Sequence, residues 1–238
     1  MTIDERRKRV IAWLEKTYED YLVASVNHYI FWEVQKIIGK NPKFTQNPND
    51  FNEWMLRVYT DSIALAVRRQ VDKGKDVISL RRLLEELRDY PEIVTRNYYL
   101  EICPPPDRGF AEKRFNDLVG ASESRLVKQQ VEDEIQKLAD ISKLIHHYVD
   151  RISAHLDKRG LTEKVPSYDE LEKCLIYFEK LIDRYHILLK GVQLIPGEVD
   201  TSSPLAFFFS GPKDGLNLVP VIVNDWQAVF RFPWIEKD

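Results

Sequence analysis

The sequence is poor in cysteine, and its two cysteines lie far apart. Cys103 and Cys174 occur without a CxxC pair and without a nearby Cys/His pattern. Zinc modules and small disulfide-stapled domains both need several cysteines at short spacing. The sequence therefore excludes a disulfide framework and a structural zinc site, and it predicts a cytoplasmic protein in a reducing environment.

Long apolar runs are also missing from the sequence. No stretch approaches the roughly 20 apolar residues that a membrane-spanning helix needs. The first residues, MTIDERRKRV, carry charge but are not followed by the apolar core of a signal peptide. We therefore expect no contact with a membrane.

The short motifs of the common enzyme classes are absent as well. The chain contains no Walker A loop, GxGxxG, GxSxG or HExxH, which excludes the easily recognised nucleotide-binding, hydrolase and metalloprotease classes. His146 and His147 are adjacent, and neighbouring residues on a helix point about 100° apart, so the two cannot bind one metal ion unaided. The sequence predicts neither a metal nor a cofactor.

What the chain does contain is a balanced mixture of apolar and charged residues. Of its 238 residues, 44% are hydrophobic and 31% are charged, with a formal net charge of -3. This mixture is typical of a soluble, helix-rich globular protein. The negative total argues against a generally basic nucleic-acid coat, but it leaves a local basic patch open.

Apolar residues recur every three or four positions over most of the first 190 residues, which predicts an all-α protein. Ser79 is a predicted N-cap, Ser167 and Glu170 form a predicted capping box, and Gly160 and Gly191 are predicted to end helices. The predicted helices cover about 4–40, 50–72, 79–90, 111–118, 123–160 and 167–190. The last of these has the spacing of an antiparallel return against the long helix before it.

Two stretches break this pattern. Residues 95–109 contain three successive prolines and are predicted to be an irregular connector. After Gly191, prolines and glycines alternate with apolar runs, and aromatic residues gather at 230–234. Such a tail is too hydrophobic to stay in solvent. We therefore expect 191–238 to pack back across the core helices (about 4–190), so that 1–238 forms a single helical domain.

Several polar residues on the predicted helices have structural interpretations. One line at spacing i, i+4, i+7 and i+11 is interpreted as an intrahelical ion-pair ladder; it consists of Asp61, Leu65, Arg68 and Asp72. Cys174 is interpreted as a small buried hydrophobe. His186 is interpreted as a hydrogen-bonded polar residue at the edge of its helix.

The flank of the predicted helix 123–160 carries the candidate chemistry. Tyr148, Arg151 and His155 follow one another at helical spacing, so Arg151 and His155 can reach the same small object. A permanent cation beside an imidazole that titrates near neutrality suits work on a phosphodiester. A solvated or partner-facing flank is the alternative interpretation.

Ten residues of this helix, V-D-R-I-S-A-H-L-D-K from Val149 to Lys158, are similar to the closing motif of the HEPN superfamily (higher eukaryote and prokaryote nucleotide-binding). The chain most resembles the branch typified by the Abi-U abortive-infection proteins of bacteria. Further similar stretches occur in the expected order at 61–87, at the Ser167 helix start and at 225–234. The resemblance implies an all-α, HEPN-like antiparallel bundle, often paired as a homodimer along the motif-bearing helices.

The resemblance also implies an activity. Many HEPN proteins are metal-independent endoribonucleases in which an Arg-x(4 to 6)-His motif from each of two chains lines one cleft. On this chain, the resemblance makes His155 the general acid or base and Arg151 the group that neutralises the phosphate, and it gives Asp150 the polar position that usually follows the motif arginine. The candidate RNA-binding residues beside them are Tyr148, His147 and Lys158.

Two functions stay open, because only three residues separate Arg151 from His155. In the first, the protein is a ribonuclease or RNA-binding component of a bacterial defence or toxin system, with an antitoxin or defence protein as partner. In the second, it is a non-catalytic helical module that binds a protein partner.

Overall fold

Helices account for the regular structure of the described part of the chain. The computed structural model describes residues 1–40, 50–103, 108–150 and 165–194. Within them it has seven α-helices, one 3-10 turn and no strand, so the prediction of an all-α fold is confirmed. The elements are α1 (Ile3–Lys40), α3 (Asp50–Gln70), α4 (Leu80–Asp89), η1 (Pro91–Ile93), α5 (Arg96–Ile102), α6 (Arg108–Leu118), α7 (Lys128–Tyr148) and α8 (Tyr168–Lys190).

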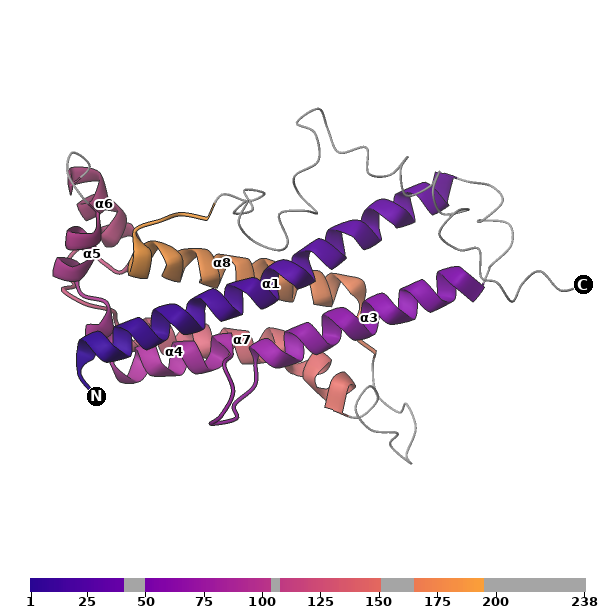
Figure 1. Ribbon diagram of the computed structural model, residues 1–238, viewed down its shortest axis with the longest axis horizontal. Coiled ribbons are helices and arrows are strands. Elements are labelled where there is room, and N and C mark those ends of the chain that lie inside the picture. The colour runs from indigo at the N-terminus through magenta and orange to yellow at the C-terminus, as the bar shows by residue number, and fades with distance from the viewer. Residues whose placement is uncertain (41–49, 104–107, 151–164, 195–238) are drawn as a thin grey trace, which may run out of the picture. The chain divides into compact units, whose positions relative to one another are not determined.

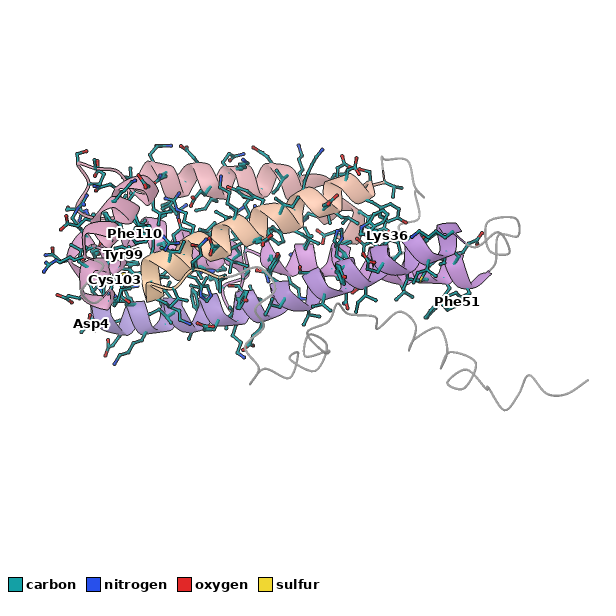
Figure 2. The ribbon with its side chains drawn as sticks, turned by 90° about the horizontal axis from the view of Figure 1, so that it is seen from above. Asp4, Lys36, Phe51, Tyr99, Cys103 and Phe110 are labelled. Atoms are coloured by element: carbon teal, nitrogen blue, oxygen red, sulfur yellow. The ribbon has the colours of Figure 1, made fainter. Side chains whose placement is uncertain are left out.

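The long helices lie side by side as an antiparallel bundle (Figure 1). Helices α1 and α7 run in one direction, whereas α3, α4 and α8 run in the other. Helix α7 packs against α4, α3 and α8, and α1 packs against α8, α3 and α4. Figure 2 shows Tyr99, Cys103 and Phe110 at the end of the bundle formed by α5 and α6, with Lys36 and Phe51 at the opposite end.

The bundle is held by one apolar core that draws on every long helix. Fully buried side chains include Leu14 of α1, Ile63 of α3, Leu84 of α4, Leu138 of α7 and Ile182 of α8. Burying a side chain of this size contributes about 1.5–3 kcal/mol, so this core is the main source of stability. Cys174 is also fully buried in this core, as the sequence predicts.

A polar group between α7 and α8 interrupts the apolar packing. Glu134 accepts hydrogen bonds from the hydroxyl of Tyr185 at 2.6 Å and forms an ion pair with Arg184 at 3.1 Å. The hydroxyl of Tyr177 donates to the main-chain carbonyl of Glu134 at 3.3 Å. Burial raises the pKa of Glu134, while Arg184 and Tyr185 oppose that rise. These bonds satisfy the Glu134 carboxylate inside the helix interface.

The predicted helix starts at Ser79 and Ser167 are confirmed by their capping bonds. The Ser79 hydroxyl accepts from the amide of Arg82 at 3.1 Å, and Ser167 and Glu170 form the reciprocal capping box. Gly191 ends α8 with a φ of 70°, a left-handed conformation that glycine adopts without a Cβ clash.

Residues 95–109 are not irregular throughout, contrary to the prediction. Thr95 caps α5, its hydroxyl accepting from the Tyr98 amide at 3.2 Å. Tyr99 then buries its ring in the core, and the Tyr98 hydroxyl donates to the carbonyl of Leu189. A cap and two anchored tyrosines stabilise α5, which ends at Ile102.

The start of the central helix also differs from the prediction. It begins at Lys128 and not at Glu123, because the preceding residues pair with the segment before α5. The amide of Arg96 donates to the carbonyl of Ser124 at 2.8 Å, and the amide of Leu126 donates to that of Val94 at 3.1 Å. These bonds require extended backbone, which delays the helix by about one turn.

The structure contradicts the interpretation of His186. It is 2% exposed and packs its ring edge to face with Tyr18, at 5.2 Å between centroids. Its Nε2 atom is buried without a hydrogen-bond partner in the described part of the chain. His186 is therefore a core residue with an unsatisfied polar atom, and the prediction of a satisfied edge residue is wrong.

The predicted packing of the tail onto the helices falls on 195–238, outside the described residues. The last described residue of this region, Leu194, donates its amide to the carboxylate of Asp183 at 2.9 Å. In the ranges that the structure describes, no helix is long and apolar enough to cross a membrane.

Candidate nucleic-acid interface

The last turns of α7 bring the candidate residues to one end of the bundle. Ile145 and Val149 are buried and fix this part of the helix against its neighbours. His147, one step round the helix, is exposed, whereas His146, Tyr148 and Asp150 are half-buried. The buried positions of this helix end pack against the neighbouring helices, and the positions between them carry polar side chains that reach solvent.

Asp150 links α7 to α3 through both of its carboxylate oxygens. Its Oδ1 accepts a hydrogen bond from Nε of Arg68 at 3.0 Å. Its Oδ2 lies 3.1 Å from Nδ1 of His146, one helical turn earlier. A guanidinium from α3 and an imidazole from α7 therefore share one carboxylate.

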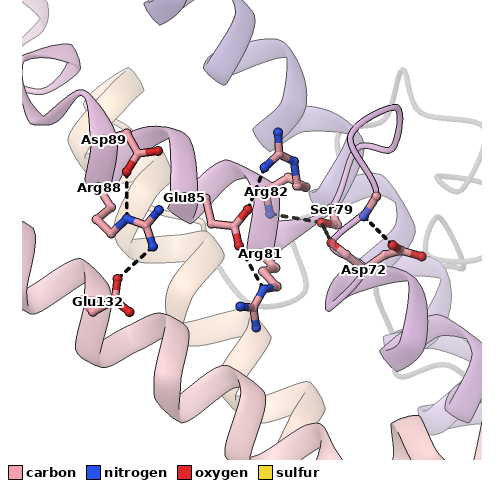
Figure 3. A network of polar contacts seen from close by, with 9 residues as sticks. Asp72, Ser79, Arg81, Arg82, Glu85, Arg88, Asp89 and Glu132 are labelled. Carbon is pink, nitrogen blue, oxygen red and sulfur yellow. Dashed lines mark hydrogen bonds and ion pairs between the residues drawn. The ribbon is translucent and has the colours of Figure 1, made fainter.

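Arg68 is itself oriented from within α3 and from the following loop. Its Nη1 donates to Oδ2 of Asp72 at 2.9 Å, so the ion pair expected within the 61–72 line is confirmed. Asp72 in turn accepts from the amide of Gly74 at 2.8 Å, and the Ser79 hydroxyl donates to its carbonyl at 2.8 Å (Figure 3). The Gly74 bond and then Arg68 lower the pKa of Asp72, which keeps this carboxylate ionised.

A second network joins α4 to the first turns of α7, at the opposite end of α7 from the site. The Arg88 guanidinium bonds to Asp89 at 2.8 Å and to Glu132 of α7 at 2.9 Å (Figure 3). Glu85 accepts from Arg81 and Arg82 along the same helix. These pairs are partly exposed, so each contributes little to stability, and their effect is on orientation.

The electrostatic surroundings of His146 favour its neutral form. Burial lowers its pKa below the ordinary 6.5, and the charges of Arg68, His147 and Lys73 act in the same direction, while Asp150 opposes them. For Arg68, burial alone would lower the pKa, but the hydrogen bonds and charges of Asp150 and Asp72 raise it. Near pH 7 the pair is a neutral imidazole beside a permanent cation.

A neutral imidazole next to a carboxylate has a defined proton arrangement. Nδ1 of His146 lies 3.1 Å from Oδ2 of Asp150. In the tautomer whose Nδ1 proton faces this carboxylate, Nε2 carries the lone pair that accepts a proton. Within the described residues, Nε2 of His146 and Nη2 of Arg68 make no hydrogen bond. Asp150 thus lies between His146, whose Nε2 can accept a proton, and Arg68, whose Nη2 can donate a hydrogen bond.

Tyr148 contacts α3 about two turns before Arg68. Its hydroxyl donates to Oδ1 of Asp61 at 3.3 Å. The 61–72 line therefore does more than pair its own charges along α3, since Asp61 and Arg68 both bond to residues of α7.

The candidate residues divide into two sets by position. His147, Tyr148 and Asp150 lie at the end of α7, where the structure describes them. The others, Arg151, His155 and Lys158, fall in 151–164, outside the described residues. Their predicted roles stay predictions, as does that of Asp150.

Sequence reasoning missed the joint position of Arg68 and His146. One signal was present, because His146 and Asp150 are spaced i, i+4 and share a helix face. The contact with Arg68 joins residues 82 positions apart, and no local pattern carries such information. In the described ranges, no group of three or more His, Cys, Asp or Glu could hold a metal ion.

Comparison with known proteins gives one finding. A HEPN family model described as AbiU2 matches residues 8–203, which is most of the chain and includes all of α7 and the segment after it. No curated protein and no solved structure matches the chain.

Proposed function

Because the chain belongs to the AbiU2 family of HEPN proteins, we propose that it is a metal-independent endoribonuclease of a bacterial defence system. The family itself is related to abortive infection. The observation that carries the proposal is that the family match extends through Arg151 and His155, the residues that resemble the HEPN nuclease motif.

Cleavage of RNA without a metal requires only groups that this segment contains. The ribose 2′-hydroxyl attacks the adjacent phosphorus, and His155 acts as general acid or base at the 2′ or leaving oxygen. Arg151 neutralises the charge that develops on the phosphate oxygens. Asp150 completes the motif from the preceding position.

The end of α7 supports this proposal by the kind of side chains it presents. His147 is exposed there, Tyr148 offers a half-buried ring, and Lys73 and Lys75 are exposed on the loop after α3. Exposed cations attract the phosphate backbone, and aromatic rings stack on unpaired bases. We assign RNA contacts to Tyr148 and His147 on this ground, and to Lys158 because it is a cation of the motif segment.

The active form in this proposal is a homodimer in which each chain contributes Arg151 and His155 to one cleft. A ribonuclease that acts in its own cell also needs restraint. An antitoxin or another defence protein is therefore part of the proposal as a partner.

Cleavage of single-stranded RNA in EDTA tests the proposal. Wild type is expected to cleave, whereas Arg151→Ala and His155→Ala are each expected to lose at least about 100-fold in rate, because each removes a transition-state interaction. Arg125→Ala, which removes an exposed arginine just before α7, is the charge-matched control and should cleave like wild type. Intact RNA with wild type and both variants would refute the proposal.

One observation favours a second function, a non-catalytic module that binds a protein partner. Trp54, Val58 and Leu65 are exposed on one stripe of α3, and exposed apolar stripes mark protein interfaces. In this case, the cellular effect of the protein should disappear in Trp54→Glu and Leu65→Glu and persist in Arg151→Ala and His155→Ala. The opposite pattern would exclude the module.

A further inference from the structure

His146, Asp150 and Arg68 form a constellation to which neither the family resemblance nor the proposed function assigns a joint task. The imidazole and the guanidinium come from different helices and bind opposite oxygens of the same carboxylate, at 3.1 and 3.0 Å. Their side chains are 35% and 26% exposed. Solvent, and hence a ligand, can reach both groups.

The outward-facing atoms of this constellation differ in character. Nε2 of neutral His146 accepts a proton, and Nη2 of Arg68 donates a hydrogen bond with a positive charge behind it. A ligand that fits must present a hydroxyl beside an anionic oxygen. A ribonucleotide has that combination in its 2′-hydroxyl and its adjacent 3′-phosphate, whereas a deoxyribonucleotide lacks the hydroxyl.

We infer that His146, Asp150 and Arg68 form a binding and proton-transfer site for a ribonucleoside 3′-phosphodiester, with His146 as a second catalytic imidazole. Arg68 binds a phosphate oxygen through Nη2. Asp150 is a positioning residue, because it orients His146 through Nδ1 and Arg68 through Nε. The inference rests on the proposed ribonuclease function, which it extends by a general base.

The reaction step is a transesterification that balances without any other reactant. The 2′ oxygen forms a new bond to phosphorus while the bond from phosphorus to the 5′ oxygen breaks. The 2′ proton passes to Nε2 of His146, and the departing 5′ oxygen takes a proton from water, which the imidazolium of His146 then restores. The products are a 2′,3′-cyclic phosphate and a 5′-hydroxyl end.

The neighbourhood of His146 gives the site a testable pH dependence. The charged or titratable groups that face it are Arg68, Asp72 and Lys73 from α3 and its loop, with His147 and Asp150 from its own helix. A base must be neutral to accept a proton, so kcat/KM should rise with pH through the pKa of His146. That rise forms the acidic limb of the pH profile.

Variants of the three residues should change this acidic limb in different ways. His146→Gln should lower kcat roughly 100-fold or more and remove the limb. Asp150→Asn should move the limb to lower pH, because Asp150 raises the pKa of His146; Arg68→Gln should move it to higher pH, because Arg68 lowers that pKa. A merely structural role would reduce the rate without these opposite shifts.

Two controls match the charge changes in the same helices. Arg69→Gln removes the neighbouring arginine of α3, which pairs with Asp20 away from the site. Asp140→Asn removes an exposed aspartate of α7. Both should keep the wild-type rate and pH profile. Full activity and an unchanged acidic limb in His146→Gln, with Arg151→Ala and His155→Ala inactive, would overturn the inference and leave the proposed function in place.

A binding measurement decides the ligand class even if no RNA is cleaved. The imidazole NMR signal of His146, assigned by its loss in His146→Gln, should shift on addition of uridine 3′-monophosphate and much less with its 2′-deoxy counterpart. No shift, or equal shifts with both, would overturn the inference. A ribose-dependent shift from a protein that cleaves no RNA would support the binding site while refuting the ribonuclease.

Discussion

His186 lies between α1 and α8 with its ring against Tyr18 and its Nε2 atom buried without a partner in the described part of the chain. Burial lowers its pKa to about 4, with Lys190 acting in the same direction and Glu15 and Asp183 opposing. The folded protein therefore holds this imidazole neutral, whereas the unfolded chain protonates it below its ordinary pKa of about 6.5. Acid thus favours the unfolded state.

The consequence is a loss of stability between about pH 6.5 and pH 4. From the difference between the two pKa values, the His186 contribution amounts to about 3 kcal/mol and is lost fully only below the folded-state pKa. In urea unfolding at pH 7 and pH 4.5, His186→Leu should show a smaller acid-induced loss than wild type. His147→Gln, at an exposed histidine, is the control, and an equal acid-induced loss in wild type and His186→Leu would contradict this account.

The roles of single residues were harder to predict from the sequence than the helices were. The burial of His186 depends on α1 crossing over α8, a contact between distant parts of the chain. The partner of Asp150 likewise lies 82 positions away. Cys174 was predicted correctly because its place on the apolar stripe of α8 is a local property.

At the scale of the element, the ends of α8 were predictable because caps are encoded within a few residues. Ser167 and Glu170 satisfy two amide groups that the first turn would otherwise leave without partners. The start of α7 was not predictable in this way, since the residues just before it are held extended by pairing with the start of α5 and the segment before it.

Removal of the Ser167 cap should destabilise the protein without changing its fold. Ser167→Ala is expected to lower the free energy of unfolding by about 1 kcal/mol, because the amide of Glu170 loses its acceptor. Urea denaturation followed by circular dichroism measures this loss. Ser122→Ala, at an exposed loop position, should change stability by much less, and equal losses in the two variants would argue against the capping role.

At the scale of the whole molecule, periodicity was enough to predict an all-α protein, and the HEPN resemblance implied the antiparallel bundle. Amphipathic helices of this length have few ways to bury their apolar stripes, and short connections make neighbours antiparallel. The helical class therefore followed from local patterns and the bundle architecture from the resemblance, and the family match over 8–203 agrees with both. The candidate site did not follow in the same way, because it depends on side chains that meet only after the helices have packed.

The proposed nuclease also predicts the state of assembly. A cleft lined by Arg151 and His155 from two chains requires a dimer, so light scattering should give about twice the 28.1 kDa of one chain. The measurement belongs at the protein concentration of the cleavage assay. A single-chain mass in a solution that cleaves RNA would refute the two-chain cleft.

The polar group around Glu134 has a consequence for how α7 can move. Sliding α7 along α8 by one turn, about 5.4 Å, would carry the Glu134 carboxylate away from both Arg184 and Tyr185 and strand a charge among hydrocarbon side chains. The two helices are thus locked in register. In the function that we propose, a change of activity would then come from reorientation of the side chains at the end of α7 and not from translation of the helix.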